Sequence, residues 1–285
     1  MANITPRIAL VTGSSSGIGR AAALALNRAG FRTIATSPHI ERLDALEAAG
    51  CEALHLDLTD ESSMVEAVET VEELHGPIQV LVNNAGYGQY GPIEEVPIEA
   101  VRRQFEVNVF GLIRMCQWVV PGMRRFGSGR IINVSSVAGE VSQPGAGLYH
   151  ATKHAIEAIS DTLRMELGPF NIDVVDIQPG PVATNFAETA IAHIPDTGLG
   201  SPYLIFKRNL VATTRDMLSF KRPDVLTADE VASAIVQAAT ARRPDTRYHV
   251  GLSSKVTSLL HTVLPDRVWD FAVSRLVPAD RERAH

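Results

Sequence analysis

The 285-residue sequence is short of several features that would point to particular classes of protein. It has two cysteines, Cys51 and Cys116, which lie far apart and form no CxxC pair, so we expect reduced thiols in or near the core. No apolar run is long enough to cross a membrane, and the first one leads straight into a glycine turn, so neither a membrane span nor a signal peptide is expected. A cytoplasmic location is the default expectation.

Clustered positive charge is also missing. The lysines and arginines number 26 against 32 aspartates and glutamates, which gives a formal net charge of −6 and argues against a nucleic-acid partner. Apolar residues make up 45% and charged residues 20%, the composition of a soluble globular protein with an ample core. No repeat or linker interrupts the chain, so residues 1–285 are predicted to form a single domain.

Short apolar runs alternate with helical patterns along most of the chain. Alternation of this kind predicts right-handed βαβ units and therefore an α/β fold with a doubly wound parallel sheet, the Rossmann fold. Strands are predicted at residues 7–11, 31–37, 51–58, 77–86, 130–136, 171–180 and 246–251. Helices are predicted at residues 21–30, 41–50, 61–76, 98–125, 149–167 and 227–240.

A glycine-rich turn follows the first strand. In TGSSSGIG, Gly13, Gly17 and Gly19 allow a sharp turn, a close approach of ligand to backbone, and tight packing of the next helix. The positive end of that helix then faces a pyrophosphate. A tight turn without a ligand is the alternative, but the strand before it and the helix after it favour a dinucleotide site.

Tyr149 and Lys153 are four residues apart, so a helix would present the phenol and the ammonium on one face. A free phenol has a pKa of about 10, and a nearby lysine charge favours the phenolate. Proton transfer to or from an alcohol or carbonyl then becomes feasible. The strand before this pair ends in two hydroxyls, Ser135 and Ser136. Taken alone, the Tyr-x-x-x-Lys spacing is a weak signal.

Taken together, these stretches resemble the short-chain dehydrogenase/reductase family from about Ile8 to about Gly251, most closely its hydroxysteroid and retinol dehydrogenase branch. The residues that carry the resemblance are TGSSSGIG at 12–19, Asp57, NNAG at 83–86, Asn108, Ser136, Tyr149 with Lys153, and PGPVAT at 179–184. Each lies at the carboxyl end of a predicted strand or on the following helix. The resemblance implies an oxidoreductase that uses NAD or NADP.

The resemblance also implies the catalytic roles. Tyr149 is the acid/base, and Lys153 lowers its pKa and holds the nicotinamide ribose. Ser136 hydrogen-bonds the substrate oxygen; it is chosen over Ser135 because it lies thirteen residues before Tyr149 and side chains alternate along a strand. Asn108 holds a water that relays protons to Lys153. From the residues alone, Asn108 can also be a buried structural amide.

For the cofactor, the resemblance implies that the glycine turn surrounds the pyrophosphate and that residues after three further strands complete the site. A helix N-cap is the alternative role for Asp57, and the N-cap of the helix that follows residue 184 is the alternative role for Thr184; both alternatives stay open. The implied contacts are Gly13, Ser15, Ser16, Gly17, Ile18 and Gly19; Ser37; Asp57 and Leu58; Asn83, Asn84, Ala85 and Gly86; Asn108, Tyr149 and Lys153; and Pro179, Gly180, Val182 and Thr184.

The choice of cofactor depends on the end of the second strand. Ser37 stands where an acidic residue would bind the ribose hydroxyls and repel a phosphate, and Pro38 stands where an arginine would accept the phosphate. With no carboxylate present, and with His39 or Arg42 nearby, NADP is favoured, while NAD stays possible.

The substrate is expected to be a small apolar alcohol, ketone or aldehyde, of a steroid-, retinol- or lipid-like kind. Residues 185–225 are markedly apolar, with Tyr203, Leu204, Ile205, Phe206, Leu210, Met217 and Phe220. This segment can cover the substrate or simply pack onto the domain, and both interpretations stay open. The extension at 253–285 can reach over the substrate mouth, a partner subunit or a membrane surface with Trp269, Phe271 and Leu276. Its mixed charges and short apolar stretches make the membrane the least favoured of these.

Three further expectations concern partners and function. His150 and His154 are interpreted as surface residues and no metal is expected, because no HExxH motif or acidic third ligand accompanies them. Helices at 101–125 and 149–167 resemble those through which the family forms homodimers or homotetramers, although core packing also explains their apolar stripes. A non-catalytic redox sensor is the alternative function, disfavoured by the intact catalytic set, and a sugar-nucleotide epimerase is disfavoured by the glycine spacing.

Overall fold

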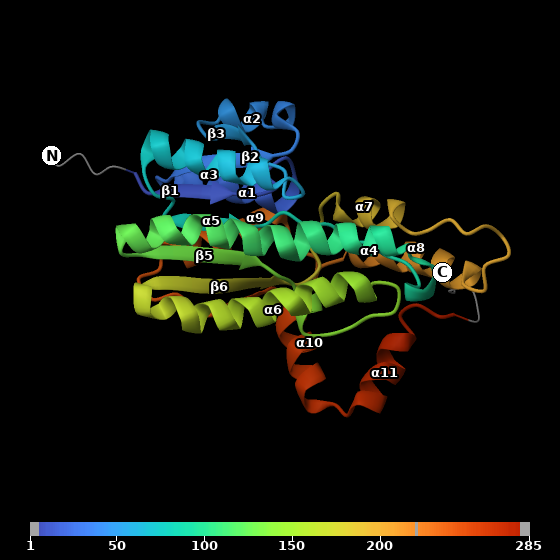
Figure 1. The fold of residues 1–285 in the computed structure, drawn as a ribbon. Helices are drawn as coiled ribbons and strands as arrows, with labels where there is room; N and C mark the ends of the chain where they lie inside the picture. Colours follow the sequence, from blue (N-terminus) through green and yellow to red (C-terminus); the bar gives the residue numbers. More distant parts are fainter. Residues whose placement is uncertain (1–5, 220–221, 280–285) are drawn as a thin grey trace.

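The computed structural model describes residues 6–219 and 222–279. Seven parallel strands form one sheet in the order β3-β2-β1-β4-β5-β6-β7 (Figure 1). The order reverses between β1 and β4, where ligands bind in open sheets of this kind. The strands are β1 (Ile8–Val11), β2 (Arg32–Ser37), β3 (Glu52–His55), β4 (Val80–Asn83), β5 (Gly129–Val134), β6 (Ile172–Pro179) and β7 (Arg247–Val250). The α/β doubly wound prediction is confirmed, because every pairing is parallel.

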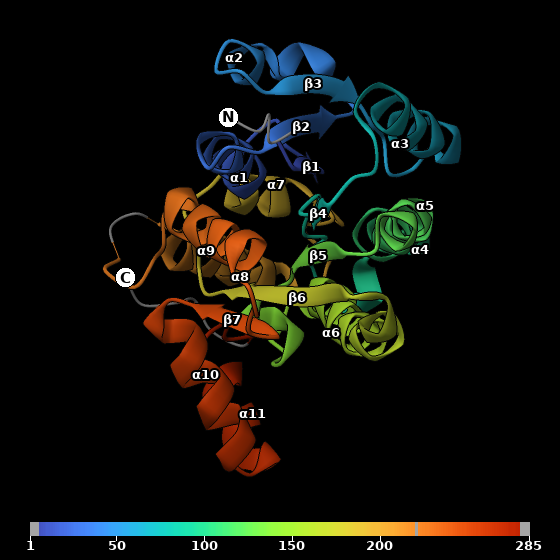
Figure 2. The same ribbon diagram turned by 90° about the vertical axis from the view of Figure 1, so that its left-hand side faces the viewer.

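Helices cover both faces of the sheet, as Figure 2 shows along its edge. One face carries α1 (Gly17–Arg28), α2 (Asp44–Glu47) and α9 (Ala228–Thr240). The other carries α3 (Glu61–His75), α5 (Gly111–Phe126) and α6 (Gly147–Leu167). The predicted helix at 41–50 is shorter than expected, because a 3-10 turn at Ile40–Arg42 precedes α2. Other 3-10 turns lie at Ile93–Glu95, Val137–Gly139 and Gly168–Phe170.

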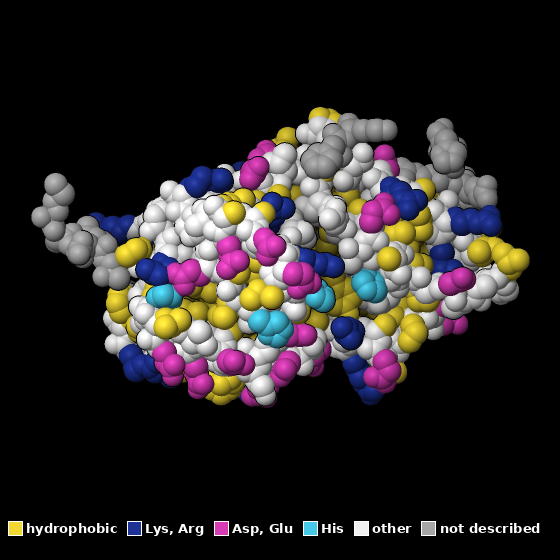
Figure 3. Space-filling view, turned by 90° about the horizontal axis from the view of Figure 1, so that it is seen from above, with side chains coloured by type: hydrophobic (Ala, Val, Ile, Leu, Met, Phe, Trp, Pro, Cys, Tyr) yellow, Lys and Arg dark blue, Asp and Glu magenta, His cyan; other side chains and the backbone are white. Residues whose placement is uncertain are grey.

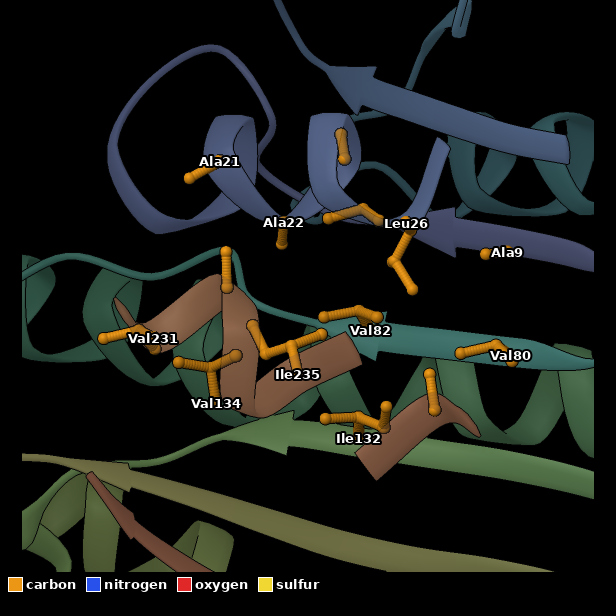
Figure 4. Packing of buried hydrophobic residues seen from close by; sticks show 14 of the residues in the cluster. Ala9, Ala21, Ala22, Leu26, Val80, Val82, Ile132, Val134, Val231 and Ile235 are labelled. Carbon is orange, nitrogen blue, oxygen red and sulfur yellow. The ribbon is translucent and has the colours of Figure 1, made fainter. Parts of the chain in front are cut away.

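The core between α1, α9 and the sheet explains the alanine-rich sequence of α1. Ala22 and Leu26 lie close to Val231 and Ile235 of α9 and to the valines of β4 (Figure 4). Small side chains allow the helices to approach closely, and each fully buried Leu or Ile contributes about 1.5–3 kcal/mol. Cys51 and Cys116 are buried and free, as predicted.

The predicted helix at 98–125 is divided in the structure. α4 (Ile98–Phe105) passes into a π-helical segment at Glu106–Phe110 before α5 begins. A π-helical turn contains one extra residue, which changes the direction of the side chains that follow it, and such turns are common at functional sites. Asn108 lies inside this segment.

The region after β6 and the C-terminal region are helical. α7 (Phe186–Ala192) and α8 (Leu204–Met217) lie between β6 and α9, while α10 (Leu252–Val263) and α11 (Asp266–Ser274) project from the body of the molecule (Figures 1 and 2). Phe220, one of the apolar residues singled out in 185–225, lies outside the described residues. Within 6–219 and 222–279, no helix is both long enough and apolar enough to cross a membrane. On the face in Figure 3, acidic and basic side chains are intermixed.

Candidate active site

A cavity of about 600 Å³ lies at the carboxyl ends of β1, β4, β5 and β6. It brings together residues from five separate stretches of the chain, as expected for an open parallel sheet. The predicted site residues in its wall are Gly13, Ser15, Ser16, Gly17, Ile18, Gly19, Asn84, Ala85, Gly86, Ser136, Tyr149, Lys153, Pro179, Gly180, Val182 and Thr184.

The glycine turn is held against the loop after β4. Gly13 and Gly17 have φ angles of 70° and 55°, which favour glycine. A Cβ on Gly19 would collide with the Gly13 carbonyl oxygen and with Nδ2 of Asn84. The Asn84 amide itself donates to the carbonyl oxygens of Thr12 and Gly13, at 2.8 and 3.2 Å. The turn is thus fixed in the shape that leaves its backbone open to the cavity.

The N-terminus of α1 suits an anionic ligand. Its N-cap, Ser16, makes no side-chain capping hydrogen bond, so the first N–H groups of the helix are not capped by their own neighbour. Unpaired N–H groups and the helix dipole together favour phosphate at such a position. The turn and the helix therefore fit the pyrophosphate of a dinucleotide.

The catalytic candidates line the same cavity. Tyr149 lies in the first turn of α6, and Nζ of Lys153 lies 5.7 Å from the centroid of its ring. The Lys153 ammonium donates to the carbonyl oxygen of Val134, at 2.8 Å, which ties α6 to the end of β5. The Ser136 hydroxyl accepts from the Ala138 N–H at 3.1 Å and also hydrogen-bonds the Tyr149 phenol. A hydroxyl, a phenol and an ammonium therefore surround one part of the cavity.

Burial governs the protonation of this group. The Tyr149 ring forms part of the cavity wall and is only partly buried, but the surrounding protein desolvates the phenol and raises its pKa, and the Ser136 hydrogen bond opposes that rise. Burial lowers the pKa of Lys153 to about 8, against the opposing charges of Glu157 and Asp176. The expected net lowering of the Tyr149 pKa is thus not found in this structure, because desolvation outweighs the neighbouring groups. A lowering by Lys153 when cofactor is bound stays a prediction.

Asn108 does not line the cavity. Its amide is buried and spans the loop after β4 and helix α6: Nδ2 donates to the Tyr87 carbonyl at 2.9 Å and to Oγ1 of Thr152 at 3.1 Å, while Oδ1 accepts from the Tyr87 N–H at 3.1 Å. These contacts give it the structural role that the sequence left open. Its role in a proton relay stays a prediction.

The two asparagines of NNAG face different ways. Asn83 lies inside the sheet, where its amide donates to Oδ1 of Asn133 at 2.9 Å and contacts Cys116. Asn83 therefore stabilises the central sheet, and alternation along the strand turns it away from the cavity wall. A contact of Asn83 with the ribose side stays a prediction. Asn84 is the one that reaches the glycine turn.

Three other predicted cofactor contacts do not lie in the cavity wall. The Ser37 hydroxyl accepts from the His39 N–H, and Oδ1 of Asp57 accepts from the N–H and hydroxyl of Thr59, both at 2.8 Å. Leu58 is buried beside Gly111 of α5. Asp57 is not a helix cap either, since Asp60 caps α3. Contacts from these residues to a bound cofactor stay predictions.

The sequence left two roles open for Thr184, a cofactor contact and a helix cap, and the structure agrees with parts of both. Thr184 lines the cavity, and its Oγ1 also accepts from the Phe186 N–H at 3.3 Å. The N-cap of α7 is Asn185, one residue later.

The expectation that His150 is a surface residue is wrong. The residue is buried rather than on the surface, it lines the cavity, and its Nδ1 lies within hydrogen-bonding distance of the Val141 carbonyl oxygen. Burial lowers its pKa, so the imidazole is biased towards the neutral form. The spacing from His150 to Lys153, Glu157 and Ser160 is that of one helical face, and this periodicity could have identified it. His154 is exposed, as expected, and among the described residues no cluster suited to a metal ion is found.

Aromatic and aliphatic residues complete the wall; Tyr90, Phe186, Leu218 and Val273 were not predicted individually, whereas Met217, Trp269 and Leu276 were named in the segments expected near the substrate. Phe186 and Tyr90 lie around Tyr149, with ring centroids 5.2 and 6.2 Å from it. Met217 and Leu218 from the end of α8 extend the apolar surface. From the C-terminal helices come Trp269, Val273 and Leu276, so the tail reaches over the cavity, one of the three positions expected for it.

Comparison with known proteins agrees with this geometry. Residues 7–194 match the family model described as short chain dehydrogenase. A probable short-chain type dehydrogenase/reductase from Helicobacter pylori, VdlC, is 37% identical over 97% of this chain and 99% of the relative. An NADPH-dependent 3-dehydrocapnine reductase from Ornithobacterium rhinotracheale is 33% identical over 94% of this chain and 97% of its own. Human retinol dehydrogenase 8 is 31% identical, covering 90% and 86%.

Among solved structures, a short-chain dehydrogenase from Streptomyces avermitilis superposes with a TM-score of 0.79 at 33% identity. The match covers 96% of this chain and 99% of that one, so it includes the C-terminal region as well as the sheet.

Proposed function

The chain belongs to the short-chain dehydrogenase/reductase family of NAD(P)-dependent oxidoreductases, and from this premise we propose the reaction that it catalyses. A hydride passes between C4 of the nicotinamide of NADP and the carbinol or carbonyl carbon of an apolar alcohol, ketone or aldehyde. Tyr149 acts as the acid/base. The observation that carries the proposal is the convergence of Tyr149, Ser136 and Lys153 on one cavity that the glycine turn also lines.

The proposed division of labour follows from that geometry. The dinucleotide supplies the hydride, and the protein supplies binding, orientation and protons. The glycine turn and the N-terminus of α1 hold the pyrophosphate, and Gly180, Val182 and Thr184 line the cavity on the nicotinamide side. Positioning of this kind makes the transfer effectively unimolecular.

The protonated state of the Tyr149 phenol suits carbonyl reduction. The raised pKa of Tyr149 keeps the phenol protonated at neutral pH, so it can donate a proton to a developing alkoxide. The Ser136 hydroxyl, which hydrogen-bonds that phenol, polarises the same substrate oxygen. Lys153 stabilises the phenolate that remains. Alcohol oxidation uses the same groups in reverse.

The end of β2 supports NADP as the cofactor. Ser37 places no carboxylate there to repel a 2′-phosphate, and the side chains of His39 and Arg42 are exposed just beyond it. The Ornithobacterium relative is described as NADPH-dependent. NAD is the competing cofactor.

The cavity wall supports an apolar substrate. Tyr90, Phe186, Met217 and Trp269 surround the space beside Tyr149, and retinol dehydrogenase 8, one of the relatives, acts on an apolar alcohol by its name. Phe186 belongs to α7 and Met217 to α8, which supports residues 185–225 as the segment that covers the substrate. Phe206 and Leu210 of α8 instead pack with Tyr90 and Ala146, so part of the segment serves ordinary packing.

The test is consumption of NADPH, and separately of NADH, by the purified protein over a panel of apolar ketones and aldehydes. We expect turnover that prefers NADPH and that falls at least about a hundredfold in Tyr149→Phe, while NADPH binding measured by fluorescence is kept. Tyr248→Phe is the matched control, because this hydroxyl only accepts from the Asp245 N–H on the far side of the sheet. Full turnover in Tyr149→Phe would remove the proposal. Tight cofactor binding without turnover in either direction would favour a redox sensor.

A further inference from the structure

Helix α10 turns its apolar face away from the body of the protein. Its large apolar side chains, Leu252, Val256, Leu259, Leu260 and Val263, are spaced along one face and are 42–77% exposed. The face towards the body consists of small hydroxyl residues: Ser253 and Thr257 line the cavity, and Ser254 is fully buried and donates to the Gln178 carbonyl at 2.9 Å. An amphipathic helix of a globular protein normally buries its apolar face. The outward apolar face of α10 therefore needs a partner outside the described fold.

Helix α11 extends the same surface. Val268 and Phe271 are 48% and 58% exposed, while Trp269 and Val273 point into the cavity wall. The Trp269 ring packs against His261 of α10 at a centroid distance of 5.0 Å, which links the two helices. They project from the body as one hairpin, residues 252–274, with the Pro265 turn at its tip (Figures 1 and 2). Among the described residues, other exposed apolar side chains such as Leu74 of α3 and Met165 of α6 lie on separate elements.

Charge on the hairpin region differs from charge on the whole chain. Within the hairpin, Lys255 and Arg267 balance Asp266 and Asp270, and Arg275 follows directly, whereas the whole chain has a formal net charge of −6. The Arg275 guanidinium lies over the Phe271 ring at 3.6 Å, so a cation borders the apolar surface directly. An anionic lipid surface would repel most of this molecule but not the hairpin.

The length of α10 limits how this surface can bind a lipid bilayer. α10 has twelve residues, which is about 18 Å of helix and too short to cross the hydrocarbon core. A short helix with an apolar face and bordering cations lies in the boundary between headgroups and acyl chains. The sequence alone disfavoured a membrane role because the charges of the tail are mixed and its apolar stretches are short, but it did not show that the apolar face points outward.

We propose that the α10–α11 hairpin docks on the surface of a lipid bilayer and that the cavity it lines receives an apolar substrate from the acyl layer. The second half rests on the proposed function. The hairpin is suited to both tasks, because its outer side carries the exposed apolar residues while Trp269, Val273 and Thr257 on its inner side form the cavity wall. A bilayer also accommodates a projecting element without the complementary surface that a protein partner would need.

The docking test is flotation of the full-length protein with vesicles of three parts phosphatidylcholine to one part phosphatidylglycerol. We expect the wild type to float and Leu259→Asp to bind at least about tenfold less, because the substitution puts a charge in the apolar layer. Leu74→Asp is the matched control; it is similarly exposed, at 70% against 63%, and should float like the wild type. Phosphatidylcholine vesicles alone should retain weaker binding.

The same experiment separates a bilayer from a second copy of the chain. If the hairpin binds lipid, sedimentation of the wild type, Leu259→Asp and Leu74→Asp without vesicles should give the same mass for all three. Dissociation of a wild-type dimer by Leu259→Asp, with no flotation of the wild type, would assign the surface to self-association and overturn the proposal. A wild type that does not float, or a control that loses binding equally, also overturns it.

Failure of docking and failure of the proposed chemistry are distinguishable. Leu259 is not in the cavity wall, so Leu259→Asp should keep wild-type turnover of a water-soluble ketone without vesicles, while kcat/KM for a long-chain ketone held in vesicles should fall about tenfold. Equal kcat/KM of both proteins on the vesicle-held ketone would overturn substrate delivery. Flotation without any Tyr149-dependent turnover would leave docking in place and remove the proposed function.

Discussion

Asn108 and Tyr87 are paired through both backbone groups of Tyr87. Nδ2 of Asn108 donates to the Tyr87 carbonyl at 2.9 Å, and the Tyr87 N–H donates to Oδ1 of Asn108 at 3.1 Å. The pairing joins the π-helical segment to the loop after β4, and Tyr87 itself lines the cavity. Through Thr152, whose hydroxyl donates to the Tyr149 carbonyl at 2.7 Å, the same amide reaches the helix that carries Tyr149. One buried side chain thus supports both sides of the site.

Replacing Asn108 by leucine should therefore destabilise the fold. The substitution leaves the Tyr87 N–H without its partner and removes the Asn108 hydrogen bonds to Thr152 and to the Tyr87 carbonyl, which keeps only the Gln104 amide at 3.2 Å. A buried unpaired polar group costs about 1–3 kcal/mol. We expect Asn108→Leu to lower the free energy of unfolding by roughly 2–4 kcal/mol in urea titrations. Asn27→Leu, which loses a single exposed hydrogen bond to Ala49, should change it by less than about 1 kcal/mol. Equal stability of the two variants would contradict the structural role.

Gly19 should be intolerant of even a methyl group. A Cβ at this position would collide with the Gly13 carbonyl and the Asn84 amide, both of which are fixed by hydrogen bonding. We expect Gly19→Ala to weaken NADPH binding at least about tenfold by opening the turn and to cost roughly 1–3 kcal/mol of stability. Calorimetric titration with NADPH measures the first effect and thermal unfolding the second.

Gly168→Ala is the control for that experiment. A Cβ on Gly168 meets nothing within 4 Å, and its φ of −52° is ordinary for alanine. The NADPH affinity and the thermal stability of Gly168→Ala should match those of the wild type. If Gly19→Ala binds NADPH as tightly as Gly168→Ala does, the fixed turn is not what holds the pyrophosphate.

The fold was predictable from sequence because the apolar residues of most strands and helices follow the pattern that is typical of the element. Buried strands read as short apolar runs, and α3, α6 and α9 show helical spacing, so the doubly wound sheet followed from their alternation. The π-helical segment was not predictable, because FEVNVFGLI has the composition of a continuous helix and the register change depends on tertiary contacts of Asn108.

The site residues that act through the backbone or belong to a motif were predictable from the sequence. Residues whose side-chain orientation depends on contacts with their neighbours were less predictable. The glycine turn and the Tyr149 group lie in one cavity, whereas Ser37 and Asp57 are engaged by their own neighbours, His39 and Thr59. The inward face of α10 contradicts the usual rule of amphipathicity, so pattern reasoning could not orient it. The oligomeric state stays a prediction.

Glu157 should control the alkaline limit of activity. It lies one helical turn after Lys153 and is buried, and its negative charge raises the pKa of Lys153 against the burial that lowers it to about 8. The lysine must be a cation to stabilise the Tyr149 phenolate, so activity should fall as the pH rises through that value. Glu157→Gln removes the supporting charge, lowers the Lys153 pKa further, and should move the alkaline limb of kcat/KM to lower pH by on the order of one unit.

Three features make the test specific to Lys153. Arg247, which pairs with Glu157 at 3.1 Å, keeps Asp161 at 2.6 Å, so the link between β7 and α6 survives the substitution. Glu188→Gln removes an exposed carboxylate that pairs with Arg215, and its pH profile should superpose on that of the wild type. Burial and the Glu157 charge raise the pKa of Asp176 to about 8, so Glu157→Gln lowers that pKa and leaves Asp176 more fully ionised. Its charge still opposes deprotonation of Lys153, so the limb should shift without vanishing. A limb that stays in place, or moves to higher pH, would show that Lys153 does not set it.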